Sequence, residues 1–179
     1  MIIGNGDIAS VLPKNDKKLF FASGVSNSQE TRESEFQREK DLLLRQKREP
    51  HLIYFSSLAV LYGKNRYAKH KREMELLVKK EFPLHTIMRL GNITWGTNPH
   101  TIINFFRNQL AKGKSIKIED TYRYIIDKDE LLHWIEMIPN WSCEMNIPGR
   151  RMKVSQIVDE YCLIGINKDR IIKIVGNKK

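Results

Sequence analysis

The feature that most constrains the fold of this chain is the alternation of short apolar runs with longer segments of helical periodicity. Largely apolar runs at 19–22, 52–55 and 86–90 are each followed by small or polar residues. The segments 67–80 and 101–111 place apolar side chains three or four positions apart, which predicts helices. Strands that alternate with helices predict a mainly parallel, doubly wound sheet covered on both faces. The expected fold class is therefore α/β.

The rest of the chain continues this alternation in shorter elements. A charged segment at 28–47 is predicted to be a helix that is largely exposed, because its apolar positions are few. Short strands are expected at 115–119, 124–126 and 144–147, with helices at 129–137 and from 155. We expect one compact unit with a shortened core at 1–112, while 113–179 contributes a small lobe.

Composition excludes several classes of protein. At 179 residues, with 41% apolar and 29% charged residues, the chain has the length and composition of one soluble globular domain. No run approaches the roughly 20 apolar residues of a membrane span. The N-terminus lacks the basic region and long apolar segment of a secretory signal, so we expect a cytoplasmic protein without membrane contact. Cys143 and Cys162 with five histidines form no spaced cluster, so no metal site is expected.

The net charge of +10 favours a polyanionic partner. That partner could be nucleic acid or a small phosphorylated ligand such as a dinucleotide or a sugar nucleotide. Charge alone does not choose between these classes. A nucleic-acid-binding protein accounts for the charge but leaves the motifs described next unexplained, so nucleic acid is the less favoured partner.

A glycine-containing turn follows the first apolar run of the chain, and Ile8, Val11 and Leu12, three or four positions apart, predict a helix after it. In the sequence GNGDIA, the first glycine permits a tight turn and the second lets phosphate groups approach the backbone. The predicted phosphate contacts are Gly4, Asn5, Gly6, Asp7 and Ile8. The ordinary alternative is that both glycines serve only the turn. A dinucleotide site also needs an acidic residue about 20 positions on, after a second strand, and that segment is missing.

A serine, a tyrosine and a lysine form the more specific motif. Tyr67 and Lys71 lie four positions apart and share one helix face, so the ammonium group can lower the pKa of the phenol and grip a cofactor ribose. The phenol could then exchange a proton with a sugar hydroxyl or carbonyl near neutral pH. Ser57, at the end of the preceding strand, would donate a hydrogen bond to the same oxygen. The alternative is a chance pair on a basic helix.

Several segments resemble one known superfamily. The motifs SS at 56–57, YG at 62–63 and YAKHK at 67–71, followed by RLGNITWG at 89–96 and TYRYIIDKDEL at 121–131, are similar to those of the extended short-chain dehydrogenase/reductase superfamily. This NAD-dependent epimerase/dehydratase group modifies nucleotide-activated sugars. The resemblance implies a shortened Rossmann-like sheet with a small C-terminal substrate lobe.

The resemblance also implies cofactors, ligands and partners. NAD or NADP would be the cofactor, with contacts from Ala22, Ser23, Gly24, Leu90 and Lys71. A nucleotide sugar would be the substrate, with Asn92 near its phosphates and Arg123 on its pyrophosphate. Without the resemblance, a surface salt bridge is the ordinary role for such an arginine. A homodimer through the helices at 28–47 and 67–80 is expected.

The chain departs from the superfamily pattern at three places. Its first turn reads GxGxxA where GxxGxxG is usual, the second-strand region is deleted, and the link from Ser57 to Tyr67 is short. Counting back from Tyr62 places Leu58 at the hydroxyl position, whereas strand register favours Ser57. Two hypotheses follow: an oxidoreductase, epimerase or dehydratase that uses Tyr67, Lys71 and Ser57, or a non-catalytic relative that binds a sugar nucleotide or has a structural or regulatory role.

Overall fold

A five-stranded parallel sheet lies at the centre of the computed structural model, which describes residues 1–119, 121–163 and 172–175. The strand order is β1–β2–β3–β4–β8, and every neighbouring pair is parallel. The strands are β1 (Ile2–Ile3), β2 (Lys18–Phe21), β3 (His51–Ser57), β4 (His85–Leu90) and β8 (Cys143–Ile147). The α/β class and the shortened, Rossmann-like parallel sheet are confirmed.

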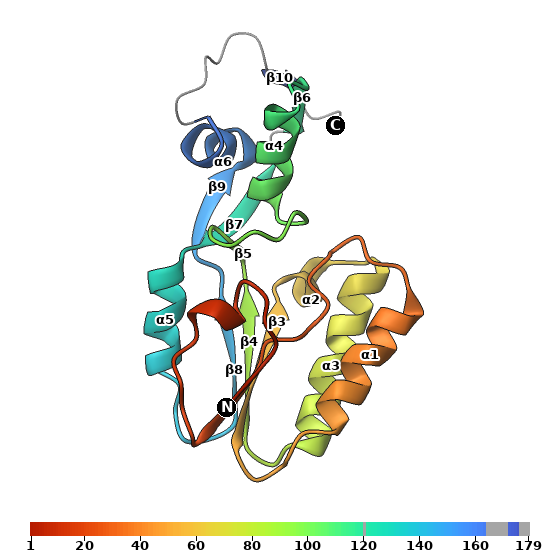
Figure 1. Cartoon of the computed structure of the whole chain (residues 1–179), viewed down its shortest axis with the longest axis vertical. Coiled ribbons are helices and arrows are strands. Elements are labelled where there is room, and N and C mark those ends of the chain that lie inside the picture. Colours follow the sequence, from red (N-terminus) through yellow and green to blue (C-terminus); the bar gives the residue numbers. More distant parts are fainter. Residues whose placement is uncertain (120, 164–171, 176–179) are drawn as a thin grey trace.

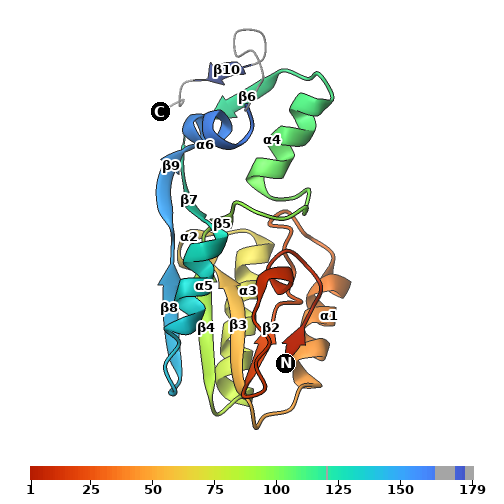
Figure 2. The ribbon, with the colours of Figure 1, turned by 60° about the vertical axis from the view of Figure 1, so that its left-hand side comes forward.

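Both faces of this sheet are covered, because alternate side chains of each strand point to opposite sides. One face packs against α5 (Lys128–Glu136), and the other packs against α1 (Glu33–Leu44) and α3 (Arg66–Glu81), as Figures 1 and 2 show. The strand residues buried on the α5 face include Phe20, Ile53, Phe55 and Met88. Those buried on the α1 and α3 face are Leu19, Phe21, Leu52, Tyr54 and Ile87.

A lobe stands beyond the carboxyl ends of the central strands (Figure 2). It contains α4 (Ile102–Ala111), β6 (Ile116–Glu119), β7 (Tyr122–Ile126), β9 (Arg150–Lys153) and α6 (Val154–Tyr161). β7 pairs with β5 (Asn92–Ile93) and β9, and β6 pairs with β10 (Ile172–Val175). Its own apolar core joins α4 and α6 to these strands.

The chain passes between the central sheet and the lobe more than once. Helix α4 precedes residue 113 but packs in the lobe. After residue 113, α5 covers one face of the central sheet and β8 is its last strand. The division at residue 113 stays a prediction, and its C-terminal range ends outside the described residues. The apolar cluster of the lobe contains α4 together with α6, and it is separate from the clusters on the two faces of the central sheet.

Two expected helices differ in the structure. The segment after the glycine turn is only the short 3-10 helix η1 (Ala9–Val11), because Pro13 restricts the residue before it and Leu12 is extended. The charged helix begins at Glu33 and ends at Leu44, inside the expected 28–47. Its start is delayed because the Glu30 carboxylate accepts hydrogen bonds from two following backbone amides and forms a turn. The short helix α2 (Ala59–Tyr62) was not predicted.

No helix among the described residues is long and apolar enough to cross a membrane.

Gly4 and Gly6 offer a matched test of the first turn. Gly4 has φ of +122°, and a Cβ there would lie 2.5 Å from the Ala22 carbonyl oxygen, whereas nothing lies within 4 Å of a Cβ on Gly6. We expect Gly4→Ala to lower the free energy of unfolding by about 1–3 kcal/mol, and Gly6→Ala to change it by less than about 0.5 kcal/mol. Urea denaturation measures both, and equal losses would contradict this account of the turn.

Candidate functional site

One large cavity lies where the carboxyl ends of the central strands face the lobe, and it encloses about 1360 Å³. Open parallel sheets bind their ligands in this position, because loops from neighbouring strands converge there. Every predicted site residue except Gly4 lines the cavity: Asn5, Gly6, Asp7, Ile8, Ala22, Ser23, Gly24, Ser57, Tyr67, Lys71, Leu90, Asn92 and Arg123. Tertiary structure thus brings together side chains that are more than 100 positions apart in the sequence.

Gly4 allows the close approach of β1 and β2 and does not line the cavity. The strands β1 and β2 approach so closely beside it that only a glycine fits against the Ala22 carbonyl. Two residues further on, Gly6 borders the cavity and leaves open the space that a side chain would fill. The two glycines of the turn therefore have different physical roles.

Asp7 fastens the glycine turn to the loop after β5. Its two carboxylate oxygens accept hydrogen bonds from the backbone amides of Thr97 and Asn98, each at 2.9 Å. The Trp95 indole donates to the Asp7 carbonyl oxygen, also at 2.9 Å. The carboxylate is therefore occupied by the protein itself, and its neighbours Asn5, Gly6 and Ile8 are the turn residues better placed for a ligand.

The two serines at the end of β3 have separate surroundings. The Ser56 hydroxyl is buried and donates to Glu75 on α3 at 2.6 Å. The Ser57 oxygen accepts from the Ala59 amide at 3.2 Å, which leaves the hydroxyl hydrogen available to the cavity. Leu58 also borders the cavity but presents only an apolar side chain. Ser57 is thus the serine whose hydroxyl can donate to a ligand.

Tyr67 stands at the first turn of α3 with its ring packed against Val25 and Phe36. The residue is 7% exposed and lines the cavity. Its phenol oxygen makes no hydrogen bond within the described part of the chain, and it is not among the buried polar atoms without a partner. The ring is therefore held by the core while the hydroxyl remains available.

Lys71 lies one turn further along α3 and is only 2% exposed. Its ammonium group donates to Glu39 Oε1 at 3.0 Å and to the Tyr54 hydroxyl at 3.2 Å. The nitrogen lies 5.9 Å from the centre of the Tyr67 ring. The sequence pattern had paired Lys71 with Tyr67 alone, whereas in the structure a buried carboxylate is its main partner.

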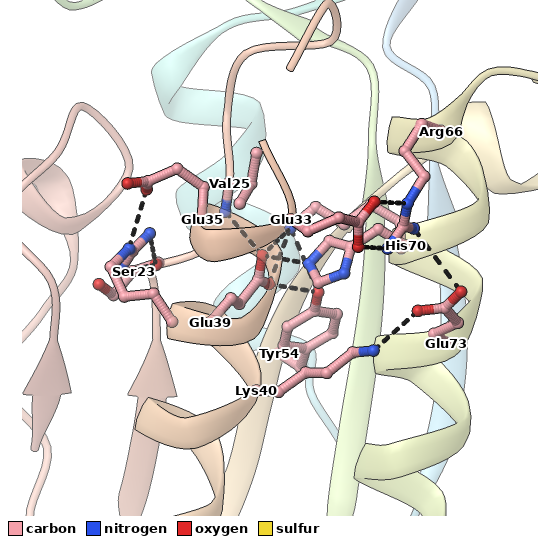
Figure 3. A network of polar contacts seen from close by, with 12 residues as sticks. Ser23, Val25, Glu33, Glu35, Glu39, Lys40, Tyr54, Arg66, His70 and Glu73 are labelled. Atoms are coloured by element: carbon pink, nitrogen blue, oxygen red, sulfur yellow. Dashed lines mark hydrogen bonds and ion pairs between the residues drawn. The ribbon is translucent and has the colours of Figure 1, made fainter. Parts of the chain in front are cut away.

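Glu39, on α1, is the shared acceptor of this hydrogen-bond network (Figure 3). Its carboxylate is fully buried and accepts hydrogen bonds from the Val25 amide at 2.7 Å, the Tyr54 hydroxyl at 2.7 Å and His70 Nε2 at 2.9 Å. Burial alone raises the pKa of Glu39, but the charge of Lys71 and the hydrogen bonds from His70 and Val25 outweigh it and lower that pKa to about 2. Glu39 is thus charged at neutral pH.

Burial raises the pKa of the Tyr54 phenol well above its usual range, and the negative charge of Glu39 raises it further. Tyr54 therefore remains a neutral hydrogen-bond donor. Nearer the surface, the same two helices are joined by ion pairs between Glu33 and Arg66 and between Lys40 and Glu73 (Figure 3). Both pairs are partly exposed, and ion pairs of this kind contribute only about 0–1 kcal/mol each.

Positive charge predominates among the residues that line the cavity. Among the described residues that line it, the cations are Arg38, Lys64, Lys71, Arg123 and Arg151, and the one carboxylate is Asp7, whose oxygens are already occupied. The Arg151 guanidinium stacks 3.7 Å above the ring of Tyr122, which also lines the cavity. A concave surface with this balance attracts anions such as phosphates.

The predicted substrate contacts both lie on the lobe side. Arg123 is exposed and donates to Thr121 Oγ1 at 2.8 Å and to the Tyr122 carbonyl oxygen at 2.9 Å. The Asn92 amide nitrogen donates to the Tyr124 carbonyl oxygen at 3.0 Å. Both side chains are thereby oriented by β7 or its neighbouring residues, and Arg123 has further donors for a ligand.

Sequence reasoning missed Glu39, Tyr54 and the cavity cations Arg38, Lys64 and Arg151. A signal for Glu39 was present, because it lies three positions after Phe36 and four before Leu43. A charged residue inside the apolar stripe of a helix indicates a buried ion pair. The three cations carried no such signal, since exposed arginines and lysines are frequent in this chain.

The fold is shared with enzymes of the NAD-dependent epimerase and dehydratase type. The Bordetella bronchiseptica enzyme WbmG, in complex with NAD and UDP, superposes with a TM-score of 0.68 at 14% sequence identity, over 90% of this chain and 60% of that one. The dTDP-glucose 4,6-dehydratase of Bacillus anthracis str. Ames, in complex with NAD, gives 0.63 at 14%, over 91% and 61%.

A third similar structure is the UDP-N-acetylglucosamine 4-epimerase of Methanobrevibacter ruminantium M1, in complex with UDP-N-acetylmuramic acid. It gives a TM-score of 0.64 at 18% identity, over 97% of this chain and 68% of that one. This chain spans about 60% of the length of the first two enzymes. No protein-family model and no curated protein matches its sequence. At these identities the likeness establishes the fold.

The stabilisation by Glu39 is expected to depend on pH. Since its pKa falls from 4.5 in the unfolded chain to about 2 in the fold, the contribution is present above about pH 5 and is lost as pH falls towards 2. The difference corresponds to on the order of 3 kcal/mol. Urea denaturation of the wild type and Glu39→Gln at pH 7 and pH 3 measures it. The difference in free energy of unfolding between the wild type and Glu39→Gln should fall by about half from pH 7 to pH 3. An unchanged difference would contradict this pH dependence.

Proposed function

We propose that this chain acts on a nucleotide-activated sugar in the manner of NAD(P)-dependent epimerases, dehydratases and reductases. The observation that carries the proposal is that Ser57, Tyr67 and Lys71 line one positively charged cavity at the carboxyl ends of the central strands. The likeness to sugar-nucleotide enzymes supports the same general kind of function.

The nucleotide part of the substrate would bind on the lobe side of the cavity. Arg123 and Arg151 provide guanidinium groups that match the oxygens of a pyrophosphate. Asn92 lies at the junction of the lobe with the central sheet and borders the same space. A pyrophosphate held here would leave the attached sugar within the cavity, where Tyr67 and Ser57 also stand.

NAD or NADP would bind on the opposite side, near β1 and β2. The glycine turn fits a pyrophosphate there, because the open space at Gly6 allows a close approach to the backbone. Asn5, Gly6 and Ile8 would hold the phosphates, Asp7 would fix the turn beside them, and Ala22, Ser23, Gly24 and Leu90 would lie along the rest of the cofactor. When bound, the cofactor accepts or returns the hydride.

The chain's own side chains would move the proton. Tyr67 would take a proton from a sugar hydroxyl as the carbon beneath it is oxidised, or return one when a carbonyl is reduced. Lys71 would hold the ribose of the cofactor beside Tyr67, and Ser57 would donate a hydrogen bond to the reacting oxygen. Tyr67 has no internal partner that competes for its hydroxyl among the described residues.

A second candidate is a nucleotide-sugar-binding protein without redox chemistry. Two observations favour it: Glu39 and Tyr54 already engage the Lys71 ammonium, and β1 is the edge of the sheet, with no second strand beyond it in the described part of the chain. The adenosine half of a dinucleotide would then lack the acidic residue that usually holds its ribose. The cations of the cavity would serve the nucleotide sugar alone.

Binding experiments separate the two candidates. We expect UDP to bind with a Kd below about 1 mM, and Arg123→Ala to weaken this binding about tenfold through loss of charge-assisted hydrogen bonds. Arg107→Ala, an exposed lobe arginine outside the cavity, is the matched control and should bind UDP normally. Titration calorimetry measures each. Binding of NAD or NADP as well supports the enzyme, UDP binding alone supports the second candidate, and no UDP binding contradicts both.

Tyr67 and Tyr62 provide a matched pair for catalysis. Both line the cavity, but Tyr62 is 67% exposed on α2 whereas Tyr67 is packed above Lys71. We expect Tyr67→Phe to lower kcat by about 100-fold or more, because the proton donor and acceptor is lost, while Tyr62→Phe keeps near wild-type turnover. Reduction of NAD or NADP at 340 nm in the presence of nucleotide sugars reports the rate. Equal activity of both variants would remove Tyr67 from the mechanism.

Assembly and location remain expectations. A homodimer would use α1 and α3, whose facing surfaces within one chain are already joined by ion pairs such as Arg66 with Glu33. Neither the assembly nor the location is needed for the chemistry proposed for the cavity.

A further inference from the structure

The Glu39 carboxylate is the point where four segments of the chain meet. It extends from α1 and accepts hydrogen bonds from the Val25 amide in the loop after β2, from Tyr54 on β3, and from His70 and Lys71 on α3. It is fully buried and does not itself line the cavity. Any influence of Glu39 on a ligand must therefore pass through a neighbour.

Lys71 is the neighbour that reaches the cavity. The Lys71 ammonium group donates to Glu39 Oε1 at 3.0 Å, to Glu39 Oε2 at 3.4 Å and to the Tyr54 hydroxyl at 3.2 Å. Because Lys71 also borders the cavity, its positive charge acts on an anionic ligand there. The charged or titratable groups around Lys71 are Glu39 on α1, Tyr54 on β3, and Tyr67 and His70 on its own helix. Glu39 is the only carboxylate within hydrogen-bond distance of Lys71 among the described residues.

Gly24 closes over this ion pair from the cavity loop. A Cβ at this position would lie 2.6 Å from Lys71 Nζ and 2.8 Å from Glu39 Oε1, so the pair occupies the space beside the glycine. The next residue, Val25, donates its amide to the same carboxylate. Glu39 therefore fixes the ammonium group and also the loop that borders the cavity beside it.

From this geometry we propose that Glu39 is a positioning residue that keeps the Lys71 amine charged and fixed at the wall of the cavity. Lys71 can be buried as a cation only because a carboxylate neutralises it there. The consequence for ligands rests on the proposed function: binding of an anionic cofactor beside Lys71 depends on Glu39, although Glu39 touches no ligand.

The direct test is the titration of Lys71 itself, followed by NMR of its ¹⁵Nζ and ¹³Cε nuclei and assigned with Lys71→Met. We expect the titration midpoint of Lys71 to fall by at least one pH unit in Glu39→Gln, because the buried ammonium loses its counter-charge. Glu73→Gln is the matched control, since it removes a carboxylate from the outer side of α3 that pairs with Lys40. It should leave the Lys71 midpoint unchanged.

An unchanged Lys71 midpoint in a folded Glu39→Gln variant would overturn the proposal, as would an equal shift in Glu73→Gln. If Glu39→Gln does not fold, Glu39→Asp replaces it, because the shorter side chain keeps the charge but withdraws it from the ammonium. A smaller downward shift of the midpoint then supports the proposal, and no shift overturns it.

Ligand binding is measured separately with NAD. We expect Glu39→Gln to weaken NAD binding about tenfold, with a larger loss as pH rises through the lowered Lys71 midpoint, and Glu39→Gln combined with Lys71→Met to bind no worse than Lys71→Met alone. Additive losses would overturn the coupling between the two residues. If the wild type does not bind NAD, the redox function fails, while the Lys71 titration still decides the role of Glu39.

Discussion

Burial of one carboxylate obliges four parts of this chain to meet. A carboxylate removed from water is stable as an anion only when donors and a positive charge replace its hydration, and Glu39 finds them in Val25, Tyr54, His70 and Lys71. Through these contacts α1, α3, β3 and the loop after β2 are held together beneath the cavity. The location of Lys71, and with it one wall of the candidate site, depends on this interaction.

The cavity is complete although no strand lies beyond β1 among the described residues. The cavity is bordered mainly by the carboxyl ends of β2, β3 and β4 and by the lobe, and all of these are present. In a full dinucleotide-binding fold the region beyond β1 holds the adenosine. In this chain β1 is the edge strand of the sheet. The cavity therefore depends on parts of the fold that this chain contains, and the region beyond β1 is where its sheet differs from a full dinucleotide-binding fold.

Much of the fold followed from local patterns. Buried strands such as 52–55 and amphipathic helices such as 67–80 were predicted within a few residues of their observed bounds, because the burial of alternate or periodic apolar positions determines them. Errors arose where a single local interaction overrode the pattern. Pro13 shortened the expected first helix to η1, and the Glu30 turn delayed the start of α1.

The sequence by itself determined the alternation of strands and helices, the glycine turn, and the spacing that puts Tyr67 and Lys71 on one helix face. These are properties of neighbouring residues, so they can be read along the chain. Only the tertiary structure decided that Glu39 binds Lys71, that Gly4 serves the sheet while Gly6 borders the cavity, and that the lobe brings Arg123 and Arg151 to the same space. The physical reason is that ion pairing, steric fit and cavity formation join residues far apart in the sequence, and a local pattern does not identify the distant partner.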